Sequence, residues 1–403
     1  MTKRRLDDLG IFGGKPEFQE PVHVGQLNLP SWERFEEAFS GIFARRYFTN
    51  HGPLVRELDQ RLAGYLGVRN VVCVTNGTVA LMVACKALDL HGEVIVPSFT
   101  FPATVQALSW AGLTPVFCDI DAHTHNISAA LAEPLISPRT CAILGVHVWG
   151  RACDPAGLQR LCDARGIRLF FDAAHGLGCE HDGSSLATLG DVAIYSFHAT
   201  KVFSSAEGGC LATNDDRLAE RIRTVRNFHV AETFDRVPLR INGKMTEAQA
   251  AMGLLSLENL DDWIRRNVEL YRHYAEWDAK ESVGAFVDYV GGQRSNHQYC
   301  MFDIDPVRLG ISRNQMLAVM RAENVLARRY FYPGVHRLTP YNSLSPDADR
   351  FLPATLTISE RLLQLPLGAG IDLGTVDRIT AIMEICHQHA GELRARMDPA
   401  IQQ

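Results

Sequence analysis

Two residues of this chain, Lys201 and Asp172, have the types and contexts that one kind of chemistry requires. Lys201 ends the string Ser196-Phe-His-Ala-Thr-Lys201, and Asp172 follows an apolar run in Phe171-Asp-Ala-Ala-His175. A lysine amine can hold an aldehyde cofactor as a Schiff base, and a carboxylate can keep a pyridine nitrogen protonated so that the ring accepts electrons. Alone, either residue would be a solvated charge or a helix cap. Together they indicate a pyridoxal phosphate (PLP) enzyme.

The elements around these two residues predict that both lie at one edge of a sheet. Residues 168–171 and 192–195 are short apolar runs that end just before Asp172 and Ser196. In open parallel sheets, ligands bind at the carboxyl ends of the strands. Residues 200–209 have no helical or strand period and are rich in small side chains, so we expect a loop whose backbone approaches a ligand closely.

A third segment could hold a phosphate group. An apolar strand begins at Val71 and is followed by Asn76-Gly-Thr78 and an apolar helical period. A strand, a Gly turn and a helix that starts at Thr78 leave backbone N–H groups and a hydroxyl free for a phosphate. Such turns are routine, so this assignment depends on Lys201.

Longer strings resemble one family, the DegT/DnrJ/EryC1/StrS sugar aminotransferases, which are fold type I PLP enzymes. The resemblance covers nearly the whole chain, and its most specific parts are Pro97-Ser-Phe-Thr-Phe-Pro-Ala-Thr104, Phe171-Asp-Ala-Ala-His175, Ser196-Phe-His-Ala-Thr-Lys201 and Asn242-Gly-Lys-Met-Thr-Glu-Ala-Gln-Ala-Ala251. Further strings, among them Asn296-His-Gln-Tyr299, are similar to the branch that contains the 4-aminotransferases of desosamine biosynthesis.

The resemblance implies a role for each matching position. Lys201 is the Schiff-base lysine, Asp172 is the pyridinium partner and His175 lies beside the ring. Phosphate contacts are implied for Gly77, Thr78 and Ser196.

Phe101 falls where the family places an aromatic ring over the cofactor. Stacking on a flat conjugated ligand is physically reasonable. The alternative is ordinary core packing, because Phe99 and Phe101 alternate as they would at the end of a strand.

Asn242 is implied to reach the cofactor phosphate of a neighbouring subunit, so that a homodimer has shared active sites. The alternative is a helix entry turn at Asn242, with Thr246 as N-cap and Gln249 in the capping-box position. Both interpretations are compatible.

The implied reaction transfers an amino group from L-glutamate to C4 of a nucleotide-linked keto sugar, with pyridoxamine phosphate as the intermediate form of the cofactor. The implied substrate is dTDP-4-keto-6-deoxy-D-glucose, which gives dTDP-4-amino-4,6-dideoxy-D-glucose. Arg329, Tyr330 and His336 precede a loop where family members shape the sugar-nucleotide pocket. Arg and Tyr suit a diphosphate, although a solvated charged loop beside an aromatic anchor explains them equally well.

Alternative activities remain open. A 3-keto sugar aminotransferase of the same family would use the same lysine, and the nucleotide could be UDP or GDP. Sugar dehydratases that use pyridoxamine phosphate carry His in place of Lys201, which argues against that activity. A Cys desulfurase is disfavoured because the sequence has no convincing mobile Cys loop, and an amino-acid aminotransferase usually needs a carboxylate-binding Arg in the small domain. A non-catalytic PLP-binding regulator is less consistent with the sequence, since residues before Pro30 are too few for a helix-turn-helix module.

Composition is typical of a cytoplasmic metabolic enzyme. The chain has 403 residues, 46% hydrophobic content and a net charge of −6, which disfavours a nucleic-acid surface. No apolar run reaches membrane-spanning length, and the first residues lack a signal peptide's apolar region. The ten cysteines and fifteen histidines form no metal-ligand spacing, so we expect no metal and reduced, buried thiols.

Alternating periodicities predict an α/β architecture, a mostly parallel sheet wrapped by helices plus a smaller C-terminal α+β domain. Strands are expected near 71–75, 94–97, 115–118, 141–146, 168–171, 192–195 and 210–213, and helices near 78–90, 101–111 and 154–165. A long helix from Thr246 leads to a hairpin over 286–304 and helices over 312–323 and 373–396. We therefore expect an N-terminal arm over 1–30, a PLP-binding domain over 31–255 and a small domain over 256–403.

Overall fold

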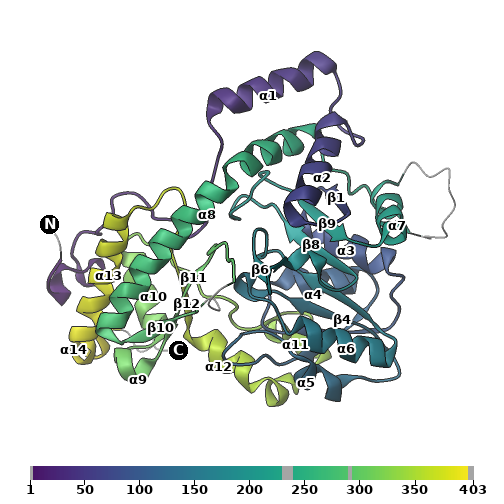
Figure 1. Ribbon diagram of the computed structural model, residues 1–403. Helices are drawn as coiled ribbons and strands as arrows, with labels where there is room; N and C mark the ends of the chain where they lie inside the picture. The colour runs from purple at the N-terminus through teal and green to yellow at the C-terminus, as the bar shows by residue number, and fades with distance from the viewer. Residues whose placement is uncertain (1–2, 229–238, 289–292, 398–403) are drawn as a thin grey trace.

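The central element of the structure is a seven-stranded sheet with the order β1-β9-β8-β5-β4-β2-β3 (Figure 1). The structure is a computed structural model and describes residues 3–228, 239–288 and 293–397. The neighbouring strands β3, β2, β4, β5 and β8 pair in parallel, whereas β9 is antiparallel to both of its neighbours, β8 and β1. Each predicted strand is confirmed to within two residues: β1 Asn70–Val74, β2 Glu93–Pro97, β3 Thr114–Cys118, β4 Thr140–Val146, β5 Arg168–Asp172, β8 Val192–Ser196 and β9 Gly209–Thr213.

Helices cover both faces of this sheet because its strands are apolar on both sides. In β1, Val72 and Val74 pack with one set of helices, while Val71 and Cys73 pack with the other. The first set is α3 Gly77–Ala87, α4 Pro102–Trp110 and α7 Asp216–Arg226. The second is α2 Pro53–Leu66, α6 Pro155–Arg165 and the first turns of α8 Glu247–Glu281. This three-layer arrangement is the predicted α/β architecture.

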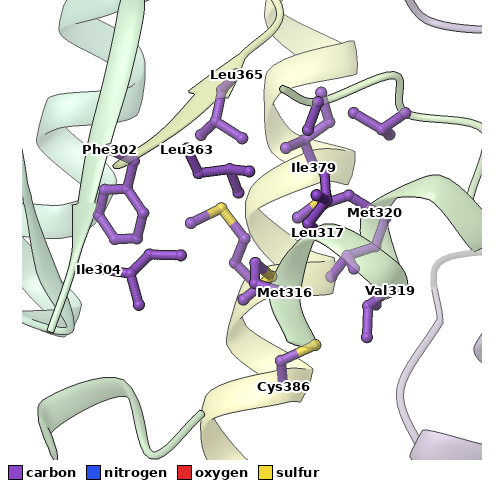
Figure 2. Close-up of a cluster of buried hydrophobic side chains, with 14 of the residues drawn as sticks. Phe302, Ile304, Met316, Leu317, Val319, Met320, Leu363, Leu365, Ile379 and Cys386 are labelled. Carbon is purple, nitrogen blue, oxygen red and sulfur yellow. The ribbon is translucent and has the colours of Figure 1, made fainter. Parts of the chain in front are cut away.

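A second, three-stranded sheet lies at the other end of α8 (Figure 1). It consists of the antiparallel strands β10 Gly284–Phe286, β11 Cys300–Ile304 and β12 Leu362–Leu365. Figure 2 shows its core, where Phe302 of β11 and Leu363 of β12 pack with Met316, in α10 Arg313–Ala322, and Ile379, in α13 Leu373–Gln388. The predicted hairpin and helices are present here, although residues 289–292 of the hairpin lie outside the described part, and the last helix divides into α13 and α14 Ala390–Arg396.

The N-terminal residues pack into this second core. Leu6, Leu9 and Phe18 are buried in the same cluster as the side chains of α10 and α13. Val22 pairs with Val325 in a parallel bridge. Residues 3–22 therefore contribute apolar surface to the C-terminal core, although sequence reasoning treated residues 1–30 as a separate arm.

Helix α8 joins the two parts of the molecule. The Thr246 hydroxyl accepts from the backbone N–H of Gln249, and the Gln249 side chain accepts from the backbone N–H of Thr246, which confirms the predicted capping box. The helix runs for 35 residues without a break, so residue 255, the expected domain boundary, lies inside it. Shorter elements complete the fold: α1 Trp32–Arg45, α5 Ala129–Ala132, β6 Glu180–His181, β7 Ser184–Ser185, α9 Pro306–Leu309, α11 Tyr341–Leu344 and α12 Pro353–Arg361.

Within the described residues, none of the helices has the length and apolar character needed to cross a membrane. Nine of the ten cysteines are buried and Cys141 is half-buried.

Candidate active site

A cavity of about 570 Å³ lies at the carboxyl ends of the parallel strands. Val146, Asp172 and Ser196, the last residues of β4, β5 and β8, all line it. Thr100 and Phe101, between β2 and α4, line it as well. The cavity therefore lies at the sheet edge where ligands of open parallel sheets bind.

Lys201 projects into this cavity from the loop between β8 and β9. Its backbone N–H donates to the carbonyl of His198 across 2.9 Å, which closes a turn. Its Nζ lies 2.9 Å from the hydroxyl of Tyr299. Burial lowers the pKa of Lys201 to about 8, against a smaller opposing effect of Asp172. At a pKa of about 8, roughly a tenth of the amine is unprotonated and nucleophilic at pH 7.

Asp172 is buried, with 6% of its surface exposed. The Thr104 hydroxyl donates to its Oδ2 across 2.8 Å, and the backbone N–H of Ala174 donates to its Oδ1 across 3.0 Å. Burial raises the pKa of this carboxyl, whereas the hydrogen bonds and Lys201 lower it. Both donors are neutral groups, so the carboxylate is oriented and retains the capacity to stabilise a cation in the cavity.

His175 lines the same cavity and is 6% exposed. The backbone N–H of Trp149 donates to its Nδ1 across 3.2 Å, so Nδ1 carries no proton. Burial, followed by the charge of Lys201, holds the pKa of His175 well below its usual range. The ring is therefore neutral with its proton on Nε2, which lies 3.0 Å from the Tyr299 hydroxyl.

Phe101 lines the cavity and is 53% exposed, whereas Phe99 is fully buried. Phe99 therefore packs in the core, whereas Phe101 faces the cavity. An exposed aromatic face at this place is available to a planar ligand, and core packing does not explain it.

The opposite part of the cavity is formed by Gly77, Thr78 and Ser196. Asn76 is the N-cap of α3, and its side chain accepts from the backbone N–H of Val79 across 2.8 Å. The N–H groups of Gly77 and Thr78 precede that bond and belong to the helix end that binds anions. A Cβ at Gly77 would lie 2.9 Å from Cβ of Ser196, so the helix end and Ser196 approach closely only because residue 77 is glycine.

Two other predicted site residues, Asn242 and Arg329, do not line this cavity. Asn242 is exposed, forms an antiparallel bridge with Asn227 and does not line the cavity of its own chain. Arg329 lines a neighbouring cavity of about 450 Å³, and Tyr330 lines both cavities.

The placement of His336 does not support the substrate contact expected from the sequence. His336 is 2% exposed and lines neither cavity. Its Nδ1 lies 2.6 Å from the Ser98 hydroxyl, and its Nε2 lies 2.8 Å from Oδ1 of Asp349. These contacts join β2 to the loops after residue 334, so the imidazole has a structural role.

Sequence reasoning did not assign roles to three residues that contact or line the site. Thr104 and Tyr299 lie within strings that marked the family resemblance, but neither string shows that these hydroxyls meet Asp172 and Lys201. Arg328 lines both cavities, although only Arg329 of the pair was selected.

The comparisons with known proteins identify the family of the chain. The model of the DegT/DnrJ/EryC1/StrS aminotransferase family matches residues 32–384, and the chain belongs to this family. A dTDP-4-amino-4,6-dideoxy-D-glucose transaminase of Shigella dysenteriae is 34% identical over 90% of this chain and 98% of its own length. An Escherichia coli protein of the same name is 32% identical over 90% of this chain and 98% of its own length.

Among solved structures, DesI in the presence of its TDP-sugar product is 41% identical, with a TM-score of 0.93 over 97% of this chain and 99% of that chain. Helicobacter pylori PseC, 22% identical with a TM-score of 0.82, shares the fold. These findings confirm the predicted family and fold class. The chain is an aminotransferase of a family whose cofactor is PLP.

The residues of the cavity fit PLP. An oriented buried carboxylate suits a protonated pyridine nitrogen, and an amine whose pKa is lowered suits an aldehyde. The start of α3, where Gly77 allows the close approach of Ser196, suits a phosphate.

Proposed function

We propose that this chain transfers the amino group of L-glutamate to C4 of dTDP-4-keto-6-deoxy-D-glucose and forms dTDP-4-amino-4,6-dideoxy-D-glucose. The observation that carries the proposal is the likeness to DesI, which extends over 97% of the chain at 41% identity and was solved with a TDP-sugar product. Two relatives named for the same amino sugar, at 34% and 32% identity, support it.

The roles of the cavity residues follow from their chemistry. When bound, PLP supplies an electron sink that stabilises negative charge on the substrate carbon after that carbon loses a proton. Lys201 would hold the cofactor through Nζ, and its free amine would move the proton at the substrate carbon. Asp172 keeps the pyridine nitrogen protonated. Its burial away from bulk water strengthens that interaction.

Further residues orient the cofactor in this proposal. Phe101 covers one face of the ring, and His175 lies beside it. The phosphate is held by Gly77, Thr78 and Ser196 at the start of α3. Backbone N–H groups and hydroxyls would provide these contacts.

The neighbouring cavity supports a nucleotide-linked substrate. Its lining includes the guanidinium groups of Arg321, Arg328 and Arg329, and it shares Phe101 and Tyr330 with the cofactor cavity. Guanidinium groups bind phosphate oxygens through paired hydrogen bonds. A diphosphate bound there would place its sugar toward Lys201. Arg329 and Tyr330 are therefore our proposed substrate contacts.

We further propose a homodimer in which Asn242 completes the phosphate site of the partner. The exposed position of Asn242, outside the cavity of its own chain, supports this arrangement. For the domains, the continuous α8 and the burial of Leu6 and Leu9 support grouping the N-terminal residues with the C-terminal domain. The cytoplasmic location stays a prediction.

One experiment tests the substrate assignment. The purified protein, loaded with PLP, is incubated with L-glutamate and 4-keto and 3-keto sugars linked to dTDP, UDP or GDP, and the products are identified by NMR. We expect amination of the dTDP-linked 4-keto sugar at C4, and no product with Lys201→Ala. Preferred amination at C3, or of a UDP- or GDP-linked sugar, would contradict the proposed substrate while leaving the aminotransferase assignment intact.

A further inference from the structure

The segment Asn296–Tyr299 is hydrogen-bonded to both loops that carry the cofactor-site residues. The Asn296 amide donates to the carbonyls of His175 and Leu177 across 2.8 and 2.9 Å. The side-chain oxygen of Gln298 accepts from the backbone N–H of Val202 across 2.8 Å. Tyr299, the next residue, places its hydroxyl between His175 and Lys201. This segment, which precedes β11, therefore holds one hydroxyl at a fixed place beside the amine.

The hydrogen bonds from Trp149 through His175 to Tyr299 have a defined direction, and the protonation state of Lys201 sets the direction of the last bond. A backbone N–H can only donate, so the Trp149 N–H fixes Nδ1 of His175 as an acceptor. The neutral ring then carries its proton on Nε2 and donates it to the oxygen of Tyr299. Burial raises the pKa of Tyr299, so its hydroxyl keeps its proton. That proton can be donated to the lone pair of a neutral Lys201 amine.

The charged amine fits this chain of hydrogen bonds less well. An ammonium group at Lys201 would donate to a Tyr299 oxygen that already accepts from His175, and the Tyr299 proton would have to turn away from both groups. With the neutral amine, the Tyr299 hydroxyl can accept from His175 and donate to Lys201, so each of these two bonds joins a donor to an acceptor. The arrangement therefore favours the neutral amine, which is the form that attacks an aldehyde and accepts a proton.

We propose that Tyr299 is a positioning residue: its hydroxyl, oriented by His175, donates to the neutral amine of Lys201 and holds Nζ in place whenever the amine is not covalently bound. This inference rests on the proposed role of Lys201. The same cavity is lined by other titratable or charged groups, namely Asp172, His175, Tyr330, Arg328, His198 and Glu207, of which Tyr330 and Asp172 raise the pKa of Lys201. The test must therefore separate the Tyr299 hydroxyl from these groups.

The first measurement uses the full chain after hydroxylamine has displaced Lys201 from the cofactor and dialysis has removed the resulting oxime. Lys201 is modified with acrylonitrile over a range of pH, and the modified peptide is quantified by mass spectrometry, which gives the pKa of this one amine. In Tyr299→Phe, which removes only the hydroxyl, we expect that pKa to rise by about 0.5 to 1, the size of one hydrogen bond. Tyr274→Phe is the matched control, because Tyr274 is fully buried and its hydroxyl donates to the carbonyl of Pro366.

A second pair of variants tests the direction of the bonds. In His175→Gln, the amide oxygen can accept from Trp149 and the amide nitrogen can donate to Tyr299, so we expect the pKa of Lys201 to stay near the wild-type value. In His175→Leu the Tyr299 hydroxyl loses its donor and becomes free to accept from the ammonium form. We then expect a rise like that of Tyr299→Phe.

The third measurement is kinetic and uses the PLP-loaded protein. We expect Tyr299→Phe to lower kcat about tenfold with little change in the KM for glutamate and with full cofactor content, because the hydroxyl acts on the released amine and not on binding.

These measurements distinguish failure of the inference from failure of the proposed function. An unchanged or lowered pKa of Lys201 in Tyr299→Phe, or an unchanged kcat, would overturn the role of Tyr299 while the role of Lys201 stands. If the wild-type protein bound PLP with no covalent bond to Lys201, that result would instead overturn the proposed function.

Discussion

The hydroxyl of Thr104 donates to Oδ2 of Asp172 across 2.8 Å, which joins the start of α4 to the end of β5 inside the cofactor cavity. Thr104 itself is 1% exposed. Because Oδ2 accepts from Thr104 and Oδ1 accepts from the Ala174 N–H, the Asp172 carboxylate is held in one orientation. The electrostatic partner proposed for the pyridine nitrogen is thus positioned by a residue of a different strand-to-helix connection.

Thr104→Val should weaken the enzyme through Asp172. The substitution keeps the shape of the side chain but removes the hydrogen bond that lowers the pKa of the Asp172 carboxyl. That pKa therefore rises, and the acid limb of the pH profile moves to higher pH. Loss of one charge-assisted hydrogen bond should lower kcat/KM about 10- to 100-fold. Thr104→Ser retains the hydroxyl and should stay near wild type. Equal activity and equal pH profiles for Val and Ser would contradict this role of Thr104.

Gly77→Ala should lower the affinity for PLP. The added Cβ would lie 2.9 Å from Cβ of Ser196, so either Ser196 or the start of α3 must move. We expect the dissociation constant for PLP, measured by fluorescence titration, to rise about 10- to 100-fold. Gly64→Ala in α2 is the matched control, because its Cβ meets nothing within 4 Å and should stabilise the helix by about 0.5 to 1 kcal/mol. Unchanged PLP affinity in Gly77→Ala would argue against a phosphate at this helix end.

The lowered pKa of Lys201 predicts a pH-dependent change in the stability of the cofactor-free protein. The folded-state pKa is about 8, and the usual value is 10.5. Between these values the unfolded chain binds more protons, so the cost of burying the amine is complete below pH 8 and declines as the pH rises toward 10.5. Lys201→Met should therefore raise the free energy of unfolding at pH 7 by about 1 to 3 kcal/mol, since the half-buried amine retains some water. Urea denaturation at pH 7 and pH 10 is the measurement, and a gain that does not shrink with pH would contradict the lowered pKa.

Much of the fold could be predicted because local signals and burial agree. The strands of the large sheet are apolar on both faces, as Val71 to Val74 show, and such runs indicate a buried parallel sheet. The start of α8 follows from Thr246 and Gln249, whose side chains form the capping box that their spacing predicts. The burial of Leu6 and Leu9 against α10 and α13 could not be predicted, because this contact joins opposite ends of the chain.

The site residues also divide into those that local sequence signals predict and those that depend on contacts between distant parts of the chain. The sequence predicts Asp172 because it ends an apolar strand, and Lys201 because it lies in the loop that follows another apolar strand. Tyr299 was not assigned, since its contact with Lys201 joins residues 98 positions apart. His336 carried the signal of a pocket residue, a His in an Arg- and Tyr-rich segment, yet Ser98 and Asp349 take up its ring nitrogens. Residue type indicates the chemistry, and only tertiary contacts decide whether it faces the cavity.

The proposed dimer predicts complementation between two inactive variants. Lys201→Ala is mixed with an inactivating Asn242 variant under conditions of subunit exchange, which is verified by mass. In a hybrid dimer one site collects both defects and the other collects neither. Random exchange should therefore restore about a quarter of the wild-type activity. If exchange occurs and no activity returns, Asn242 acts within its own chain.

The most direct test of the central claim is the absorption spectrum of the purified protein with and without Lys201. We expect wild-type protein purified with PLP to be yellow, with a visible band that disappears on reduction with borohydride and leaves the cofactor attached to the peptide that contains Lys201. Lys201→Ala should lack both the band and transamination while retaining the folded state, as judged by circular dichroism. A Lys201→Ala protein that is normally coloured and active would contradict the assignment of Lys201 and the account built on it.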